Sequence, residues 1–252
     1  MKKFQFWYSL AAASVLLSPT ALRAQNLLVS TGLGGYQTNQ YNAALFSDMK
    51  SYLVGALPST TTTGLLNNSG FALGFDRLWV DQRLQAPLSA AEITTISNFA
   101  ATGRRMVLIG ENSSWNDWNS QLAGIVGGTL AGPDCQNNNL TTAVSNALTA
   151  GVTTVNEACG YGMNGGLSLF AGRGLATLWG ANQNVLVWLD SNMQDNAHLD
   201  TVDNRKFAQN VATWLAGGSV QTVAPEPATN VLLAFGMVAV GFAARRRVKA
   251  GR

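Results

Sequence analysis

The chain has 252 residues, a formal net charge of +3 and a sequence pI near 9.0. Its basic residues gather at the two ends, and residues 25–224 hold 8 basic against 12 acidic side chains, a net charge of about −4. A body of that charge gives no electrostatic basis for binding nucleic acid, so nucleic acid is excluded as a partner.

The first 24 residues have the layout of a secretory signal peptide. Lys2 and Lys3 precede an apolar run from Leu10 to Leu17, and small residues with a proline follow up to Ala24. This order predicts export through the Sec machinery, with residues 1–24 removed after Ala24. An N-terminal transmembrane anchor is the alternative, but the apolar run is shorter than the roughly 20 residues that a membrane span needs.

Residues 25–216 are expected to form one domain, because apolar segments recur throughout and no charged or proline-rich linker divides them. The apolar pattern predicts a buried strand over residues 27–30 and a helix over residues 41–54. A polar loop or sheet edge is expected over residues 59–63, followed by a strand over residues 75–80.

The clearest helix signal in the chain is a capping box. Ser89 is followed three residues later by Glu92, and the helix that this pair opens should end at Gly103. A buried strand over residues 105–109 and a helix over residues 115–126 are predicted next.

The second half of the body is less regular. Residues 127–174 are rich in glycine and asparagine and are expected to form short strands and loops. A strand pair over residues 176–179 and 185–189 and an amphipathic helix over residues 205–215 complete the body, and residues 217–224 form a linker. The alternation of strands and helices predicts a single three-layer α/β domain with a largely parallel sheet.

The two cysteines, Cys135 and Cys159, both lie in the exported body. An oxidising periplasm favours a disulfide between them, which would stabilise the fold by roughly 3 kcal/mol. A metal pair or a catalytic thiol is the alternative, but either would need further ligands or a histidine nearby, and His198 is the one histidine of the chain.

The C-terminus holds three features in a fixed order. A triplet of Pro225, Glu226 and Pro227 bars both helix and sheet and keeps the chain extended. Residues 228–244 carry no charge and form a predicted transmembrane helix that reaches across the inner membrane. A basic tail follows, and it would stay on the cytoplasmic side and leave the body outside. The tail begins with Arg245, Arg246 and Arg247.

This arrangement resembles the PEP-CTERM sorting signal of Gram-negative bacteria, which is also known as the ice-binding protein C-terminal domain. The resemblance covers residues 225–252. It implies that an exosortase cuts near the triplet and passes the protein from the inner membrane to the cell envelope or to secreted exopolysaccharide. A simple tail anchor is the alternative.

The body resembles the class I glutamine amidotransferase-like, flavodoxin-like domains of envelope proteins. The resemblance rests on the strand over residues 75–80, the capped helix, and the segments 105–110 and 188–215. Catalytic members carry a cysteine on the turn after the strand that corresponds to residues 106–109, whereas this chain has Gly-Glu-Asn there and lacks the downstream His-x-Glu pair. The resemblance therefore implies a scaffold without enzymatic activity, and no cofactor is expected.

Four polar residues are nevertheless expected at the carboxyl ends of the strands, where open α/β folds bind ligands. They are Glu111, Asp190, Asp195 and His198. Such a cluster would serve a metal or glycan site or an envelope hydrolase, although loop carboxylates more often cap helices or face water. No metal is assigned, because the segment from Asp190 to Asp203 departs from the EF-hand pattern. Asp203 is expected to cap the final helix.

Trp115 is the tryptophan expected to be exposed, because its neighbours over residues 112–117 are Asn, Ser and Asp. An exposed indole could stack on a sugar ring. The other tryptophans of the body are expected in the core. They are Trp79, Trp118, Trp179, Trp188 and Trp214. The sequence thus predicts a non-catalytic protein of the envelope or extracellular matrix, with exopolysaccharide as its candidate contact.

Overall fold

The computed structural model describes residues 25–31, 41, 43–82, 87–132 and 134–217. The predicted signal peptide and the C-terminal triplet, span and basic tail lie outside these ranges. Within them, no helix has the length and apolar character of a membrane span.

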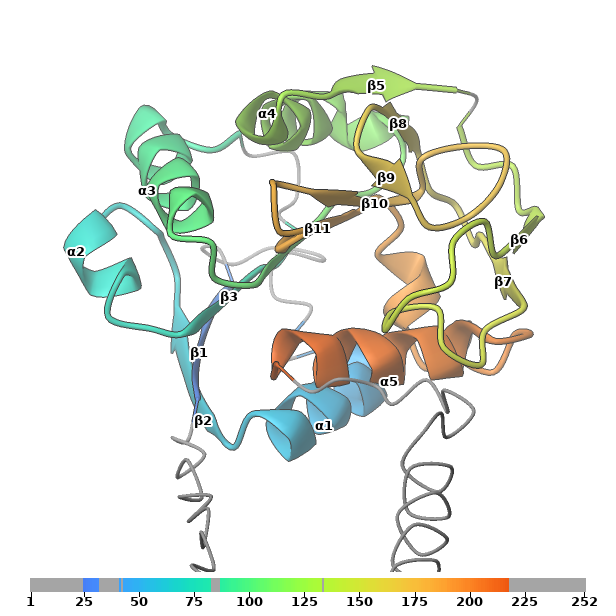
Figure 1. The fold of residues 1–252 in the computed structure, drawn as a ribbon, viewed down its shortest axis with the longest axis horizontal. Helices are drawn as coiled ribbons and strands as arrows, with labels where there is room; N and C mark the ends of the chain where they lie inside the picture. The colour runs from blue at the N-terminus through green and yellow to red at the C-terminus, as the bar shows by residue number, and fades with distance from the viewer. Residues whose placement is uncertain (1–24, 32–40, 42, 83–86, 133, 218–252) are drawn as a thin grey trace, which may run out of the picture.

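A seven-stranded mixed sheet runs through the middle of the body, in the order β2-β1-β3-β4-β11-β10-β9 (Figure 1). Five neighbouring strands are parallel, namely β2 (Ser59–Thr63), β1 (Asn26–Ser30), β3 (Arg77–Val80), β4 (Met106–Ile109) and β11 (Val185–Trp188). The last two are antiparallel, namely β10 (Ala176–Trp179) and β9 (Leu167–Ser168). The predicted mixed α/β fold with a mostly parallel sheet is confirmed.

The central strands are apolar runs because both faces of the sheet are covered. In β1, Leu27 and Val29 pack into one core and Leu28 packs into the other. β2 is instead the threonine-rich edge strand, as its polar sequence suggested. The chain places β2 on one side of β1 and then returns to place β3 on the other side, so the strand order reverses between β1 and β3.

Helices cover the two faces of the sheet in two separate layers (Figure 1). On one face, α1 (Ser47–Ala56) packs against α5 (Asn204–Leu215). The other face carries α2 (Ser69–Ala72), α3 (Ala90–Ala101) and α4 (Asn116–Val126). The described residues also form three short 3-10 helices, namely η2 (Ala44–Phe46), η3 (Ser113–Trp115) and η4 (Asn192–Gln194).

Of two helices predicted from the sequence, α3 has the expected capping box and α1 has different bounds. The capping box of α3 is present, because the Ser89 hydroxyl accepts from the Glu92 N–H and the Glu92 carboxylate accepts from the Ser89 N–H. The helix predicted over residues 41–54 was wrong in its bounds, since residues 44–46 form a 3-10 turn and α1 begins at Ser47. Helix α1 ends at Ala56. The next residue, Leu57, precedes Pro58, and a residue that precedes a proline disfavours the helical conformation.

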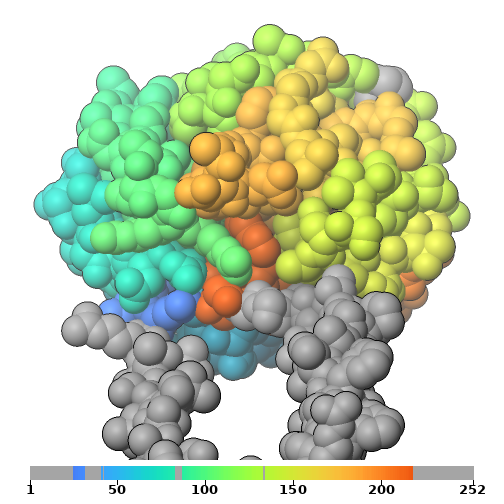
Figure 2. All heavy atoms as spheres, viewed as in Figure 1, coloured from blue at the N-terminus to red at the C-terminus, as the bar shows by residue number. Residues whose placement is uncertain are grey.

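The irregular stretch after α4 forms one side of the surface (Figure 2). It contains two small antiparallel ribbons, β5 (Thr129–Ala131) with β8 (Gly162–Asn164), and β6 (Asn139–Thr141) with β7 (Thr154–Asn156). The predicted disulfide between Cys135 and Cys159 is present and joins the segments that precede β6 and β8.

Four of the five tryptophans predicted for the core are buried there. Trp179 is the exception, because it lies in β10 near the sheet edge and is only half-buried. Its indole N–H donates to Thr177, and its ring lies where a Cβ on Gly165 or Gly166 would stand. Glycine at those two positions makes room for the ring. The apolar pattern of β10 could not indicate this contact, because the two glycines lie outside that strand.

Candidate functional site

Two buried carboxylates lie at the carboxyl edge of the sheet, where β4 and β11 end side by side. The parallel register pairs Ile109 with Trp188, so Glu111 and Asp190 follow that pair by two residues on each strand. The two residues are 1 % and 0 % exposed. The sheet therefore brings together two acidic residues that are far apart in the sequence.

The Glu111 carboxylate is fully occupied by donors from three neighbours. One oxygen accepts from the Ser191 N–H at 2.9 Å and from the Ser191 hydroxyl. The other accepts from the amides of Asn112 at 3.0 Å and Asn192 at 3.1 Å. This carboxylate thus ties the turn after β4 to the turn after β11.

Asp190 holds the disulfide-bonded segment against the sheet. Its Oδ2 accepts from the N–H groups of Ala158 at 2.8 Å and Cys159 at 3.2 Å. Its Oδ1 accepts from the N–H of Met193 in η4 at 3.3 Å. Backbone N–H groups from two different segments therefore converge on one buried side chain.

Burial disfavours the charged form of both carboxylates. It raises the pKa of Glu111 to about 7, and the hydrogen bonds from Ser191 only partly oppose that shift. The pKa of Asp190 is also raised, by burial first and by the negative charge of Glu111 second. Both shifts favour the protonated form of the carboxyl group.

Asp195 and His198 form a second, separate pair. The Asp195 carboxylate accepts from the N–H groups of Ala197 at 2.9 Å and His198 at 2.8 Å, and the His198 ring nitrogen Nδ1 lies 2.9 Å from both of its oxygens. The His198 side chain is 42 % exposed. In the described part of the chain, no hydrogen bond joins this pair to Glu111 or Asp190.

The described residues contain no group of three or more His, Cys, Asp or Glu side chains that could hold a metal ion. The predicted four-residue cluster thus appears as two pairs with different environments. Asp203 is the N-cap residue of α5, as predicted, but its side chain makes no capping hydrogen bond to the helix. Its carboxylate accepts instead from the N–H groups of Thr153 and Thr154, which precede and open β7.

Sequence reasoning missed a buried ion pair between Glu157 and Arg173. The two side chains are 0 % and 7 % exposed, and the guanidinium also donates to the Gly160 carbonyl at 2.7 Å. Glu157 further accepts from the Gln136 N–H, next to the disulfide. Both residues lie in an irregular stretch without periodicity, so no sequence signal pointed to the pair.

Trp115 is half-buried rather than exposed, and its neighbours Ser114, Asn116 and Asp117 are exposed. These residues and Trp118 line an open hollow with about 580 Å³ of free space, its mouth included. The indole nitrogen of Trp115 is buried and has no hydrogen-bond partner among the described residues. Part of the ring therefore packs on the core while its surroundings are polar.

The triplet, the uncharged span and the arginines at the C-terminus match a known family model. The family model of the PEP-CTERM protein-sorting motif matches residues 223–247. The chain carries a PEP-CTERM sorting motif. This confirms the prediction made from the triplet, the span and the arginines. A PEP-CTERM motif implies an exported protein that is processed by an exosortase and sorted to the cell envelope of a Gram-negative bacterium.

The body of the chain has known structural neighbours. The mmIFT52 N-terminal domain is similar with a TM-score of 0.60 and 14% identity, over 77% of this chain and 98% of that chain. A protein described as ThuA-like from Bacteroides uniformis has a TM-score of 0.49 and 11% identity, over 77% and 93%. A protein described as part of a GMP synthase, from Thermoplasma acidophilum, has a TM-score of 0.48 and 10% identity, over 77% and 94%. These likenesses concern the fold alone.

No curated protein matches the chain.

Proposed function

We propose that this PEP-CTERM protein acts in the cell envelope or extracellular matrix as a non-catalytic binding protein, and that it associates with exopolysaccharide. The observation that carries the proposal is the state of Glu111. The resemblance to amidotransferase-like domains implies that this residue lies in the turn where catalytic members carry their nucleophile. Here it is 1 % exposed and its oxygens accept hydrogen bonds from Ser191, Asn112 and Asn192.

A catalytic group must reach its substrate within hydrogen-bond distance. Glu111 and Asp190 are instead engaged by side-chain amides, a hydroxyl and backbone N–H groups of the protein itself. The cysteines cannot act as nucleophiles either, because Cys135 and Cys159 are joined in a disulfide. The arrangement supports a role for the carboxylates in holding the strand ends together.

A contact with polysaccharide is supported by the surface around Trp115. A partly exposed indole flanked by Asn, Ser and Asp side chains offers an apolar face for a sugar ring and polar groups for its hydroxyls. The sorting motif would deliver the body to the compartment where such polymers are exported.

The processing step is tested by mass spectrometry of the protein purified from its host, with and without the exosortase. We expect the mature protein of the normal host to lack residues 228–252 and the protein of the exosortase-deficient host to retain them. Retention of residues 228–252 in the normal host would refute exosortase processing.

The binding role is tested by sedimenting the exported protein with purified exopolysaccharide. We expect the wild-type protein to sediment with the polymer and Trp115→Ala to sediment less. Phe71→Ala is the matched control, because Phe71 is an exposed aromatic residue on α2. A wild-type protein that stays in the supernatant at every polymer concentration would overturn the proposed role.

A hydrolase that uses Glu111 and Asp190 is the rival function. One observation favours it, because raised carboxyl pKa values are common among general acids. The rival requires the wild-type protein to release new reducing ends from the polymer and Glu111→Gln to release none. We expect no release from either protein.

A further inference from the structure

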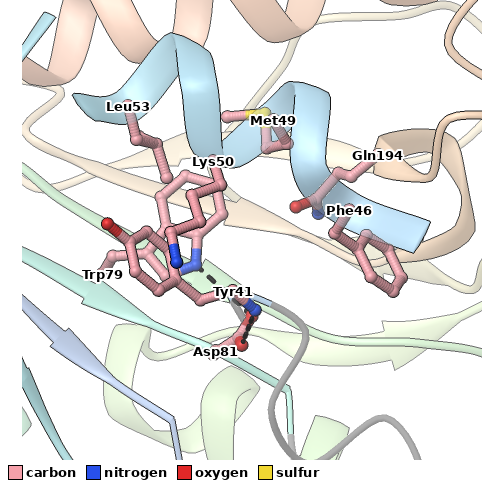
Figure 3. A pocket seen from close by; sticks show the side chains of 8 residues that line it. All are labelled: Tyr41, Phe46, Met49, Lys50, Leu53, Trp79, Asp81 and Gln194. Carbon is pink, nitrogen blue, oxygen red and sulfur yellow. Dashed lines mark hydrogen bonds between the residues drawn. The ribbon is translucent and has the colours of Figure 1, made fainter. Parts of the chain in front are cut away.

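A small pocket lies at the same carboxyl edge of the sheet, beside the point where the strand order reverses between β1 and β3. Open α/β sheets bind ligands at the carboxyl ends of their strands at such a reversal. Trp79 of β3 and Asp81 directly after it form one part of the wall, and Lys50 of α1 forms another (Figure 3). The Glu111 and Asp190 side chains are not among the pocket's lining residues.

Gln194 closes the pocket from η4, with Phe46 beside it and the Tyr41 and Trp79 rings across from it (Figure 3). Gln194 is 2 % exposed, and its side-chain Nε2 has no hydrogen-bond partner among the described residues. Leaving a buried amide unpaired costs free energy, and native proteins rarely do so without a reason. The structure therefore holds a donor ready at a position where a ligand could accept from it.

The other polar groups of the pocket have opposite charges. The Asp81 carboxylate is 1 % exposed and accepts from the Tyr41 N–H at 2.9 Å, with the Trp79 indole nitrogen at 3.4 Å. A carboxylate oxygen can accept more than one hydrogen bond. The Lys50 ammonium lies 4.7 Å from the centre of the Tyr41 ring.

These groups define the chemistry of the ligand. An anionic ligand would face Asp81 and a cationic ligand would face Lys50, so the pocket suits a neutral group. The amide of Gln194 donates and the carboxylate of Asp81 accepts, which together match a hydroxyl group, since a hydroxyl both accepts and donates.

The size of the pocket sets how much of a ligand can enter. It has about 200 Å³ of free space with its mouth included, which is below the roughly 300 Å³ at the lower end of small-molecule pockets. One polar group about as large as a water molecule fits between the side chains, and the rest of the ligand would lie at the mouth.

We propose that this pocket binds the terminal sugar of a glycan chain, with a hydroxyl group inserted between Gln194 and Asp81. The proposal rests on the association with exopolysaccharide and names the end group that the body recognises. Trp115 would contact the polymer elsewhere, whereas this pocket would select its terminus.

The test is ligand-detected NMR of the exported, disulfide-bonded protein with neutral monosaccharides, namely glucose, galactose, mannose and N-acetylglucosamine. We expect at least one of them to bind the wild-type protein at millimolar concentration and Gln194→Leu to weaken that binding by about tenfold, the equivalent of one hydrogen bond. Gln209→Leu is the matched control, because Gln209 is exposed on α5 and should leave binding unchanged.

Gln194→Leu should fold, because the side-chain nitrogen that it removes has no partner in the described protein. A circular dichroism melt confirms this before the binding experiment, and Asp81→Asn provides a second variant that should also weaken binding. The proposal is overturned if no neutral sugar binds the wild-type protein, or if Gln194→Leu and Asp81→Asn both bind as well as wild type does.

The two proposals can fail separately. If the wild-type protein sediments with exopolysaccharide but binds no monosaccharide, the pocket assignment is wrong and the association stands. If the protein fails to sediment with the polymer, the association itself is wrong, whatever the monosaccharide experiment shows.

Discussion

The carboxylate of Glu111 accepts the backbone N–H of Ser191 at 2.9 Å, although the two residues are 80 positions apart in the chain. Through this contact the turn after β4 is tied to the turn after β11. Asp190, the residue before Ser191, in turn holds the N–H groups of Ala158 and Cys159. One edge of the sheet is thus braced by two buried carboxylates.

Removing the Glu111 carboxylate should destabilise the body strongly. Glu111→Ala leaves the buried N–H and hydroxyl of Ser191 and two amide groups without their acceptor, and we expect the free energy of unfolding to fall by about 3 kcal/mol. Urea denaturation measures the change. Asp117→Ala is the control, because Asp117 is exposed on α4, and it should cost less than about 1 kcal/mol. Equal urea midpoints for Glu111→Ala and wild type would contradict the bracing role.

The raised pKa of Glu111 predicts a loss of stability at alkaline pH. Its folded pKa of about 7 lies above the ordinary value of 4.5, so the folded state binds more protons than the unfolded state between these values. The stabilisation that protonated Glu111 contributes is therefore complete below about pH 4.5 and is lost as the pH rises through about 7. Asp190 acts in the same direction.

We expect the free energy of unfolding to fall by a few kcal/mol between about pH 5 and about pH 8. Urea denaturation across that range measures the slope, and Glu111→Gln should remove much of it because the amide does not titrate. A wild-type protein that becomes more stable over this range would rule out the assignment.

Opening the disulfide should destabilise the segment that Asp190 holds. The bond closes a loop with a sequence separation of 24 residues, and its loss should cost roughly 3 kcal/mol. Thermal unfolding with and without reductant measures the effect. The double variant Cys135→Ser, Cys159→Ser is the control, since its melting temperature should be low and should not respond to reductant. An unchanged melting temperature of the wild-type protein after complete reduction would show that the bond does not stabilise the fold.

Replacing only Arg173 of the buried ion pair should destabilise the body more than replacing both Arg173 and Glu157. Arg173→Met leaves the Glu157 carboxylate buried without its cation, and we expect a loss of about 3 kcal/mol. Adding Glu157→Gln should recover part of that loss, because the uncompensated charge is then gone. Chemical denaturation of wild type, both single variants and the double variant measures the coupling. Additive losses in the double variant would argue against a direct interaction.

Features that depend on neighbouring residues could be predicted from the sequence. The capping box of Ser89 and Glu92 lies within one helical turn, and the Pro225, Glu226 and Pro227 triplet is contiguous, so each is complete in a short segment. The apolar runs of β1 and β4 indicated buried strands, because strands covered on both faces of a parallel sheet lack polar alternation. Export, the sorting motif and the α/β class followed from such patterns.

The environment of each site residue depended on the tertiary structure. Because β4 lies beside β11 in the sheet, Glu111 contacts Ser191. Asp195 instead contacts His198, three residues later in the chain. Whether Gln194 pairs or is left with an unsatisfied nitrogen depends on which side chains α1 and β3 present to it. A sequence pattern records the period of burial along one segment, whereas these contacts join segments whose mutual placement is decided by sheet order, register and packing.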